Sequence, residues 1–279
     1  MGRLASSLAL VADIGGNTFV MPVSPDRLRR TLITTLCFVA FGIGGTLTSA
    51  LFMPLLMLLP GTAALHRRRA RSVIGFCFRL LVRVITVSGC MRFATNGLEH
   101  LEQARGRLVL ANHPTYIDVV VLLSLMPQAN CVVKGALWRN PFYWGIVRAA
   151  GYINNTSPEG LIDACAESLK RGETLLLFPE GTRTTPGQSL RFQRGAAHVA
   201  LKAGIAVTPV LIACNPPTLT KGAPWWLAPE RPFTFSVDVR PPMSAGDAVT
   251  ADSAAIGARH LTDTLEDYFS RELRPYGYA

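Results

Sequence analysis

A histidine and an aspartate stand five residues apart in the segment NHPTYID, residues 112–118, which an apolar run follows. Burying a carboxylate is costly unless a partner pairs with it, and His113 is the partner within reach of Asp118. A carboxylate bonded to one imidazole nitrogen leaves the other nitrogen free to remove a proton from a hydroxyl. Although a lone histidine is more often structural, this pairing predicts that His113 is a general base and Asp118 its partner.

A second polar group follows the apolar run in LLLFPEGTRT. Backbone N–H groups, a hydroxyl and the fork-shaped cation of Arg183 occur together there, which is what phosphate recognition requires. Lys134, in CVVKGALW, follows another β-rich run and can reach the same anion if both strands end at one edge of a sheet. For FPEGTR alone, an ordinary strand exit with a solvated arginine explains the residues equally well. For Lys134 alone, a surface lysine is the better explanation.

The elements that must position these residues are short β-rich runs alternating with helical patterns from about residue 91 onward. This alternation predicts an α/β fold with helices on the faces of a sheet. Pro114 favours the first position of a helix, so we expect Asn112 or His113 to cap that helix. The expected strands are RLVLA, CVVK, ETLLLF, AVTPVLI and FTFSVDV, and the expected helices include PEGLIDACAESLKRG with Pro158 near its start, GAAHVALKAG and the closing segment TADSAAIGARHLTDTLEDYFSREL.

An N-terminal segment without charged residues, 32–60, indicates contact with a membrane. Its residues up to Met53 would form a helix of about 33 Å, against a hydrocarbon core of about 30 Å. Pro54 and nearby glycines also allow a kinked, half-inserted helix, and a buried soluble helix is the alternative. The arginine cluster HRRRAR after the segment is denser than RLRR before it, which places the following chain in the cytoplasm.

The stretch 72–88 carries polar residues every three or four positions, which is helical spacing with a wide apolar face. We interpret it as an interfacial helix, with packing on the domain as the alternative. The predicted organisation is therefore a poorly organised N-terminus over 1–30, membrane-anchoring helices over 31–89 and a catalytic domain over 90–279, on the inner or cytoplasmic membrane with the catalytic domain facing the cytoplasm.

Composition narrows the function classes. Charged residues make up 16% of the chain and hydrophobic residues 49%, which excludes a disordered chain and favours partial contact with lipid. Nearly all of the net charge of +10 belongs to residues 1–107, where arginines flank apolar segments. That placement favours an anionic membrane surface as partner and argues against nucleic acid. The six cysteines show no metal-ligand or CxxC spacing, so we expect them to be reduced.

The order of four segments resembles the glycerolipid acyltransferases of the lysophosphatidic acid acyltransferase (PlsC-like) family. NHxxxxD comes first, then Lys and Gly in KGALWRNPFYWGIVRAAGYI, then FPEGTR, then VTPVLI, and the resemblance covers roughly residues 90–245. It implies a mixed sheet flanked by helices, N-terminal helices on the membrane, and acyl transfer from acyl-CoA or acyl-ACP to a lysophospholipid hydroxyl, with neither cofactor nor metal. The acceptor would be 1-acylglycerol 3-phosphate, and the product phosphatidic acid.

The resemblance also assigns roles. His113 and Asp118 would form the catalytic dyad, and Pro209 would line the apolar pocket. The acceptor phosphate and its loop would involve Asn112, Lys134, Glu180, Gly181, Thr182 and Arg183.

Two features depart from the family pattern. GYINN lacks the arginine that many members carry there, and APWWLAPERP is an unassigned insertion. Three alternatives therefore stay open: an acyltransferase of a specialised pathway with another acceptor, a non-catalytic lipid-binding membrane protein, and a membrane-bound metallohydrolase, which would need further ligands at metal spacing.

Overall fold

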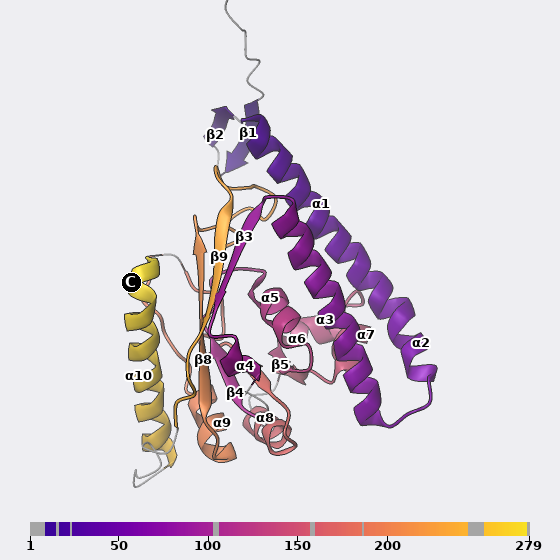
Figure 1. Cartoon of the computed structure of the whole chain (residues 1–279), viewed down its shortest axis with the longest axis vertical. Coiled ribbons are helices and arrows are strands. Elements are labelled where there is room, and N and C mark those ends of the chain that lie inside the picture. Colours follow the sequence, from indigo (N-terminus) through magenta and orange to yellow (C-terminus); the bar gives the residue numbers. More distant parts are fainter. Residues whose placement is uncertain are drawn as a thin grey trace, which may run out of the picture.

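The computed structural model describes residues 9–14, 17–22, 24–102, 106–156, 160–185, 187–244 and 254–277. Within these residues, seven strands form one mixed sheet with helices on both faces, as Figure 1 shows. This confirms the predicted fold class. Pro158, expected near a helix start, lies outside the described residues.

The sheet has the order β3-β9-β8-β4-β7-β5-β6. Neighbouring strands are parallel except for the pair of β8 and β9, which is antiparallel. The carboxyl ends of β8, β4, β7 and β5 therefore meet at one edge of the sheet. The strands are β3 Met91–Asn96, β4 Leu108–Ala111, β5 Asn130–Val133, β6 Ile153–Asn154, β7 Leu175–Leu177, β8 Val207–Asn215 and β9 Phe233–Val239.

Alternate side chains of β4 enter two separate cores. Val109 and Ala111 pack with one group of helices, whereas Leu108 and Leu110 pack with the other, which is the period of two expected of a strand buried on both faces. The first group contains α3 Ala63–Val87, α5 Asp118–Leu125 and α7 Trp144–Ala150, and the second contains α8 Leu161–Lys170, α9 Gly195–Ala203 and α10 Ala254–Leu273. Two short helices, α4 Glu99–Glu102 and α6 Gly135–Arg139, complete the connections, and a 3-10 turn Arg274–Tyr276 follows α10.

The N-terminal region has more structure than its composition indicated. A hairpin of β1 Ala9–Ile14 and β2 Asn17–Pro22 precedes α1 Pro25–Leu47. The helix begins at Pro25 because the Ser24 side chain accepts a hydrogen bond from the Arg27 N–H at 3.2 Å and proline suits the first helical turn. The first helix therefore starts six residues before the predicted boundary at residue 31.

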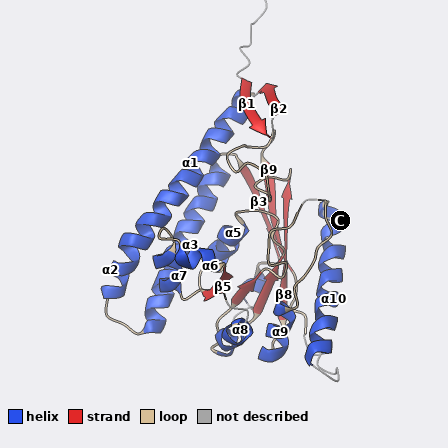
Figure 2. Cartoon of the chain, turned by 180° about the vertical axis from the view of Figure 1, so that it is seen from behind, coloured by secondary structure: helices blue, strands red, loops and turns tan. Residues whose placement is uncertain are grey.

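A single long apolar helix extends from Pro25 to Leu58, and the most apolar part of it is only 17% buried. It comprises α1, a π-helical turn Thr48–Phe52 and α2 Met53–Leu58. The π-helical turn lies just before Pro54, which cannot donate a backbone hydrogen bond. The chain then turns back, and α3 runs beside this helix (Figures 1 and 2).

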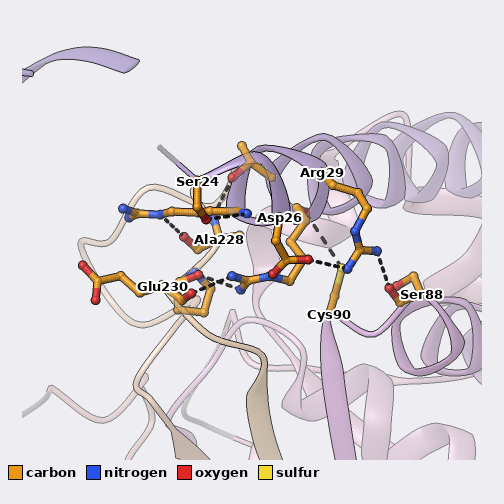
Figure 3. Close-up of polar contacts among 11 residues, drawn as sticks. Ser24, Asp26, Arg29, Ser88, Cys90, Ala228 and Glu230 are labelled. Carbon is orange, nitrogen blue, oxygen red and sulfur yellow. Dashed lines mark hydrogen bonds and ion pairs between the residues drawn. The ribbon is translucent and has the colours of Figure 1, made fainter. Parts of the chain in front are cut away.

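Polar contacts hold the long helix against the α/β domain near both ends. The buried Arg30 guanidinium donates to the carbonyls of Pro229 and Glu230, both at 2.7 Å, and to Asp26 Oδ2 at 2.9 Å. Of these partners of Arg30, Figure 3 labels Asp26 and Glu230. Near the other end, the Gly145 N–H of α7 donates to Ser49 Oγ at 2.8 Å. The helix therefore lies along the domain and does not project away from it.

The predicted helix over 72–88 forms as part of α3 and packs on the domain along one face. Gly75 makes the closest approach, because a Cβ there would lie 2.3 Å from Pro127 Cβ beside α5. The opposite face keeps Phe76, Leu80 and Val84 exposed. The alternative of packing on the domain is therefore correct for one face, and contact of the exposed face with a membrane interface stays a prediction.

Candidate active site

The two residues of the predicted dyad are in contact. His113 follows β4, and its Nδ1 lies 2.7 Å from Asp118 Oδ2. Asp118 is fully buried, whereas the His113 side chain keeps 18% of its surface exposed. With Asp118 ionised, Nδ1 carries the proton and Nε2 is left as the proton acceptor. The Phe178 ring stacks on the imidazole with centroids 4.3 Å apart, which fixes the plane of the ring.

The helix that carries Asp118 begins later than expected. Asn112 and His113 do not cap it, because α5 starts at Asp118 and residues 112–117 form the preceding turn. Thr115 instead bonds the Asp118 carboxylate from the preceding turn: its N–H donates to Asp118 Oδ2 at 2.7 Å, its hydroxyl donates to Asp118 Oδ1, and it accepts from the Ile117 N–H at 3.3 Å. These contacts hold the carboxylate beside His113, and our sequence reasoning missed Thr115.

Burial raises the pKa of the Asp118 carboxyl above its ordinary value, and the hydrogen bonds from His113 and Thr115 oppose that rise. The two Thr115 contacts therefore favour the ionised carboxylate that stabilises a protonated His113.

Glu180 joins the FPEGTR loop to the histidine loop. Its Oε1 accepts from the His113 N–H at 2.8 Å and from the Thr184 hydroxyl at 2.8 Å, while the Thr184 N–H donates to the His113 carbonyl at 2.7 Å. Burial raises the pKa of the Glu180 carboxyl, and these hydrogen bonds oppose the rise. Glu180 shapes the loop, as expected, but its bonded oxygen positions the His113 backbone and is not free for a substrate.

Arg183 lies beside the contact between the FPEGTR loop and the histidine loop, and one nitrogen of its guanidinium makes no hydrogen bond to a described residue. Its guanidinium carbon sits 3.5 Å from the centroid of the Tyr116 ring, and its Nη1 is buried with no hydrogen-bond partner among the described residues. A buried, unpaired guanidinium N–H is costly, so it marks a place for an acceptor such as a phosphate oxygen. Gly181 adopts φ +67° in the turn, and Thr182 is exposed next to it.

Lys134 is at the expected edge of the sheet, exposed directly after β5. No hydrogen bond or ion pair joins its ammonium group to another residue in the described part of the chain. The parallel strands β4, β7 and β5 bring the dyad, the FPEGTR loop and Lys134 to one edge.

Two predicted binding residues are buried. Asn112 is fully buried, and both ends of its amide bond the backbone of Ile212 on β8, at 2.8 Å and 2.7 Å. It therefore joins two strands, and its amide is buried between them away from solvent. Pro209 is buried within the central strand β8 opposite Leu110 of β4. Its expected place beside an apolar pocket stays a prediction.

Comparisons with known proteins find similarity to acyltransferases. The model of the family described as Acyltransferase matches residues 92–213. A chloroplastic 1-acyl-sn-glycerol-3-phosphate acyltransferase of Arabidopsis thaliana is 29% identical over 75% of this chain, which spans 60% of that relative's length. A 1-acyl-sn-glycerol-3-phosphate acyltransferase of Pseudomonas aeruginosa is 29% identical over 64% of this chain and 70% of the relative. The crystal structure of PlsC from Thermotoga maritima, 19% identical, superimposes with a TM-score of 0.66 over 89% of this chain and 98% of that one.

Proposed function

We propose that this chain, whose acyltransferase domain belongs to the PlsC-like family of glycerolipid acyltransferases, transfers a fatty acyl group to the free hydroxyl of a lysophospholipid. The acyl donor is the thioester of acyl-CoA or acyl carrier protein, and the acceptor is 1-acylglycerol 3-phosphate, giving phosphatidic acid. The single observation that carries the proposal is the His113–Asp118 contact of 2.7 Å. The Thr184 N–H donates a hydrogen bond to the His113 carbonyl, which holds this contact beside the FPEGTR loop.

The chemistry follows from the free nitrogen of the dyad. His113 Nε2 removes the proton of the acceptor hydroxyl while Asp118 stabilises the resulting imidazolium. The oxygen attacks the thioester carbonyl, the new C–O ester bond forms, and the C–S bond breaks. The departing thiolate takes the proton from His113, which returns the dyad to its starting state. No redox change or resident cofactor enters this balance.

Arg183 supports a phosphate-bearing acceptor. Its buried Nη1 has no partner within the described ranges, and its planar fork suits two phosphate oxygens. Lys134 contributes a second positive charge at the same edge of the sheet. The names of the plant and bacterial relatives, which specify 1-acyl-sn-glycerol-3-phosphate, support the same acceptor.

One observation favours a second candidate, the same reaction on an acceptor of a specialised pathway. The segment GYINN carries asparagines where many family members carry an arginine. Asn155 Oδ1 accepts from the Gly135 N–H at 3.0 Å, and Asn154 Oδ1 accepts from the Thr156 N–H at 2.9 Å, so both side chains organise the start of α6 and its flanking loop. A phosphate-bearing acceptor would therefore have only Arg183 and Lys134 as its proposed cationic partners, one fewer than in family members that carry the arginine.

The long helix supports attachment to the cytoplasmic side of the inner membrane. Because Arg30 and Ser49 hold it against the domain near its two ends, a half-inserted orientation along the surface fits better than a perpendicular span. The residues that would enter the lipid are large, apolar and exposed: Leu32, Leu36, Ile43, Leu47, Leu51, Phe52, Leu55 and Leu58 of the long helix, and Phe76, Leu80, Val84 and Val87 of α3.

The test is thiol release by the purified protein from acyl-CoA and from acyl carrier protein, with a panel of lysophospholipids and phosphate-free lysolipids. We expect turnover on lysophosphatidic acid, and Arg183→Ala should raise the KM for this acceptor about tenfold or more, the value of one charge-assisted bond. The KM for the donor should hardly change. Equal losses on phosphorylated and phosphate-free acceptors would contradict the phosphate role of Arg183, and the absence of turnover on any acceptor would favour a lipid-binding protein.

A further inference from the structure

We propose that the hollow between α2, the start of α3 and α7 binds the headgroup of an anionic phospholipid of the surrounding membrane. This site is separate from the acceptor site, because none of its lining residues belongs to the dyad or to the FPEGTR loop. The proposal rests on the proposed membrane attachment of the long helix, and it does not depend on the identity of the acyl acceptor.

The hollow has a volume of about 490 Å³ and two chemically different sides. Met53, Pro54 and Met57 of α2 form an apolar wall. Arg67 of α3 and Arg148 of α7 bring cations to the opposite side. A small inorganic anion would use only the cations, whereas an amphipathic anion uses both sides.

Arg67 is the arginine of the HRRRAR cluster that lines this hollow, next to His66 of the same cluster, and its charge has no counter-ion among the described residues. Arg71, one turn later, forms an ion pair with Glu173 at 3.0 Å, and Arg69 donates to the Pro60 carbonyl at 2.9 Å. No ion pair or hydrogen bond joins the Arg67 guanidinium to a residue that the structure describes. Its stem instead lies against Gly151, where a Cβ would be 2.5 Å from Arg67 Cδ.

Arg148 is also without a carboxylate partner in the described part of the chain. Its guanidinium lies over the rings of Trp144 and Trp138, 4.6 Å and 5.8 Å from their centroids. Stacking of this kind orients the guanidinium but leaves its charge and its N–H donors available. Two positive charges on neighbouring helices therefore face one hollow without an internal counter-ion, and a phosphodiester would supply one.

The surroundings of the hollow identify a lipid as the source of that anion. Leu55, Leu58 and Leu59 are exposed beside the wall formed by α2, and Trp144 is 47% exposed at the rim. Tryptophan favours the interface between headgroups and acyl chains. A phospholipid bound here would place its phosphate between the two arginines and direct its acyl chains along the exposed side of α2.

The experiment measures binding of the full chain to phosphatidylcholine vesicles with and without phosphatidylglycerol. Arg67→Gln/Arg148→Gln removes the two cations, and Arg68→Gln/Arg139→Gln is the matched control, because these arginines are exposed, lie on α3 and α6 and do not line the hollow. We expect the hollow variant to lose at least about tenfold more of the phosphatidylglycerol-dependent affinity than the control, since each lost bond involves a charged group. Acyl transfer in detergent should stay unchanged in both variants.

Two further measurements make the outcome decisive. Soluble dihexanoyl phosphatidylglycerol should change Trp144 fluorescence in the wild type, and the change should disappear in Trp144→Phe, whereas inorganic phosphate should act far more weakly. Arg67→Lys/Arg148→Lys keeps both charges but loses the planar guanidinium groups, so it should retain part of the preference for phosphatidylglycerol. This variant replaces the glutamine variant in the experiment if the glutamine variant unfolds. Equal losses in the hollow and control variants, or equal effects of inorganic phosphate and the lipid, would overturn the proposal. If the proposal fails but the protein still binds phosphatidylcholine vesicles, the proposed membrane attachment of the long helix is not contradicted.

Discussion

Replacement of Glu180 by alanine removes the contact that joins the two catalytic loops. The His113 N–H and the Thr184 hydroxyl lose the oxygen that both bond at 2.8 Å. A buried donor left without a partner costs about 1–3 kcal/mol, and the lost packing of the side chain adds to this, so we expect the free energy of unfolding to fall by about 2–4 kcal/mol. The kcat of acyl transfer should fall with it, because the His113 backbone is no longer held.

Glu180→Gln is the matched control, because it keeps an oxygen that accepts both hydrogen bonds. Burial raises the pKa of Glu180 in the folded protein above its ordinary value of 4.5, so the folded state holds a proton that the unfolded state has already released. The contribution of this group to stability is therefore complete below the unfolded pKa and is lost as the pH rises through the folded pKa. Glu180→Gln lacks this titration, so its stability relative to wild type should improve over that pH range.

The assay is chemical unfolding in detergent at several pH values, together with kcat and KM on one lysophospholipid. We expect Glu180→Ala to lower kcat strongly with a smaller change in acceptor KM, and Glu180→Gln to lie close to wild type at neutral pH. If Glu180→Ala raised the acceptor KM alone and left stability within about 0.5 kcal/mol of wild type, Glu180 would be a substrate-binding residue after all.

Three further substitutions test the elements that position the site. Thr115→Val removes the hydroxyl bond to buried Asp118 but keeps the N–H bond, so we expect about 1–3 kcal/mol of lost stability and a lower kcat with an unchanged acceptor KM, measured by unfolding and steady-state kinetics. Arg30→Met leaves the Pro229 and Glu230 carbonyls unbonded, so a loss of about 2–4 kcal/mol should appear in thermal unfolding in detergent, and a loss below about 1 kcal/mol would contradict the role of Arg30 in holding the long helix. Gly75→Ala places a methyl group 2.3 Å from Pro127 Cβ and should cost about 1–3 kcal/mol, measured in the same way, with an exposed glycine such as Gly195→Ala as control.

The strands β4, β5, β7, β8 and β9, most helices and the dyad could be predicted because their signals are local, whereas β1, β2, β3 and β6 were not among the expected strands. Apolar runs ending in polar turns identify β4, β5 and β7, and the five-residue spacing of His113 and Asp118 identifies the pair. The six cysteines lie within the described ranges and form no disulfide with one another. The contact of Thr115 with Asp118 was missed, because proline at position 114 led us to begin the helix before Asp118, where α5 starts.

The remaining features depend on contacts between distant residues. Asn112 bonds the backbone of Ile212, 100 positions away, and Arg30 bonds carbonyls about 200 positions away. Backbone carbonyls carry no residue-specific signal, so no sequence pattern announces such partners. For the same reason, the hydropathy of residues 32–60 could not predict that the long helix docks along the domain.

The most direct test of the central claim is acyl transfer by purified His113→Ala, with its thermal unfolding measured in the same detergent. His113 Nε2 is the free proton acceptor of the dyad, and the side chain lies partly exposed at the sheet edge, so we expect the rate to fall by about 10²–10⁴-fold or more while the unfolding temperature changes little. Full activity of His113→Ala, in a preparation free of contaminating acyltransferase, would contradict the proposed mechanism.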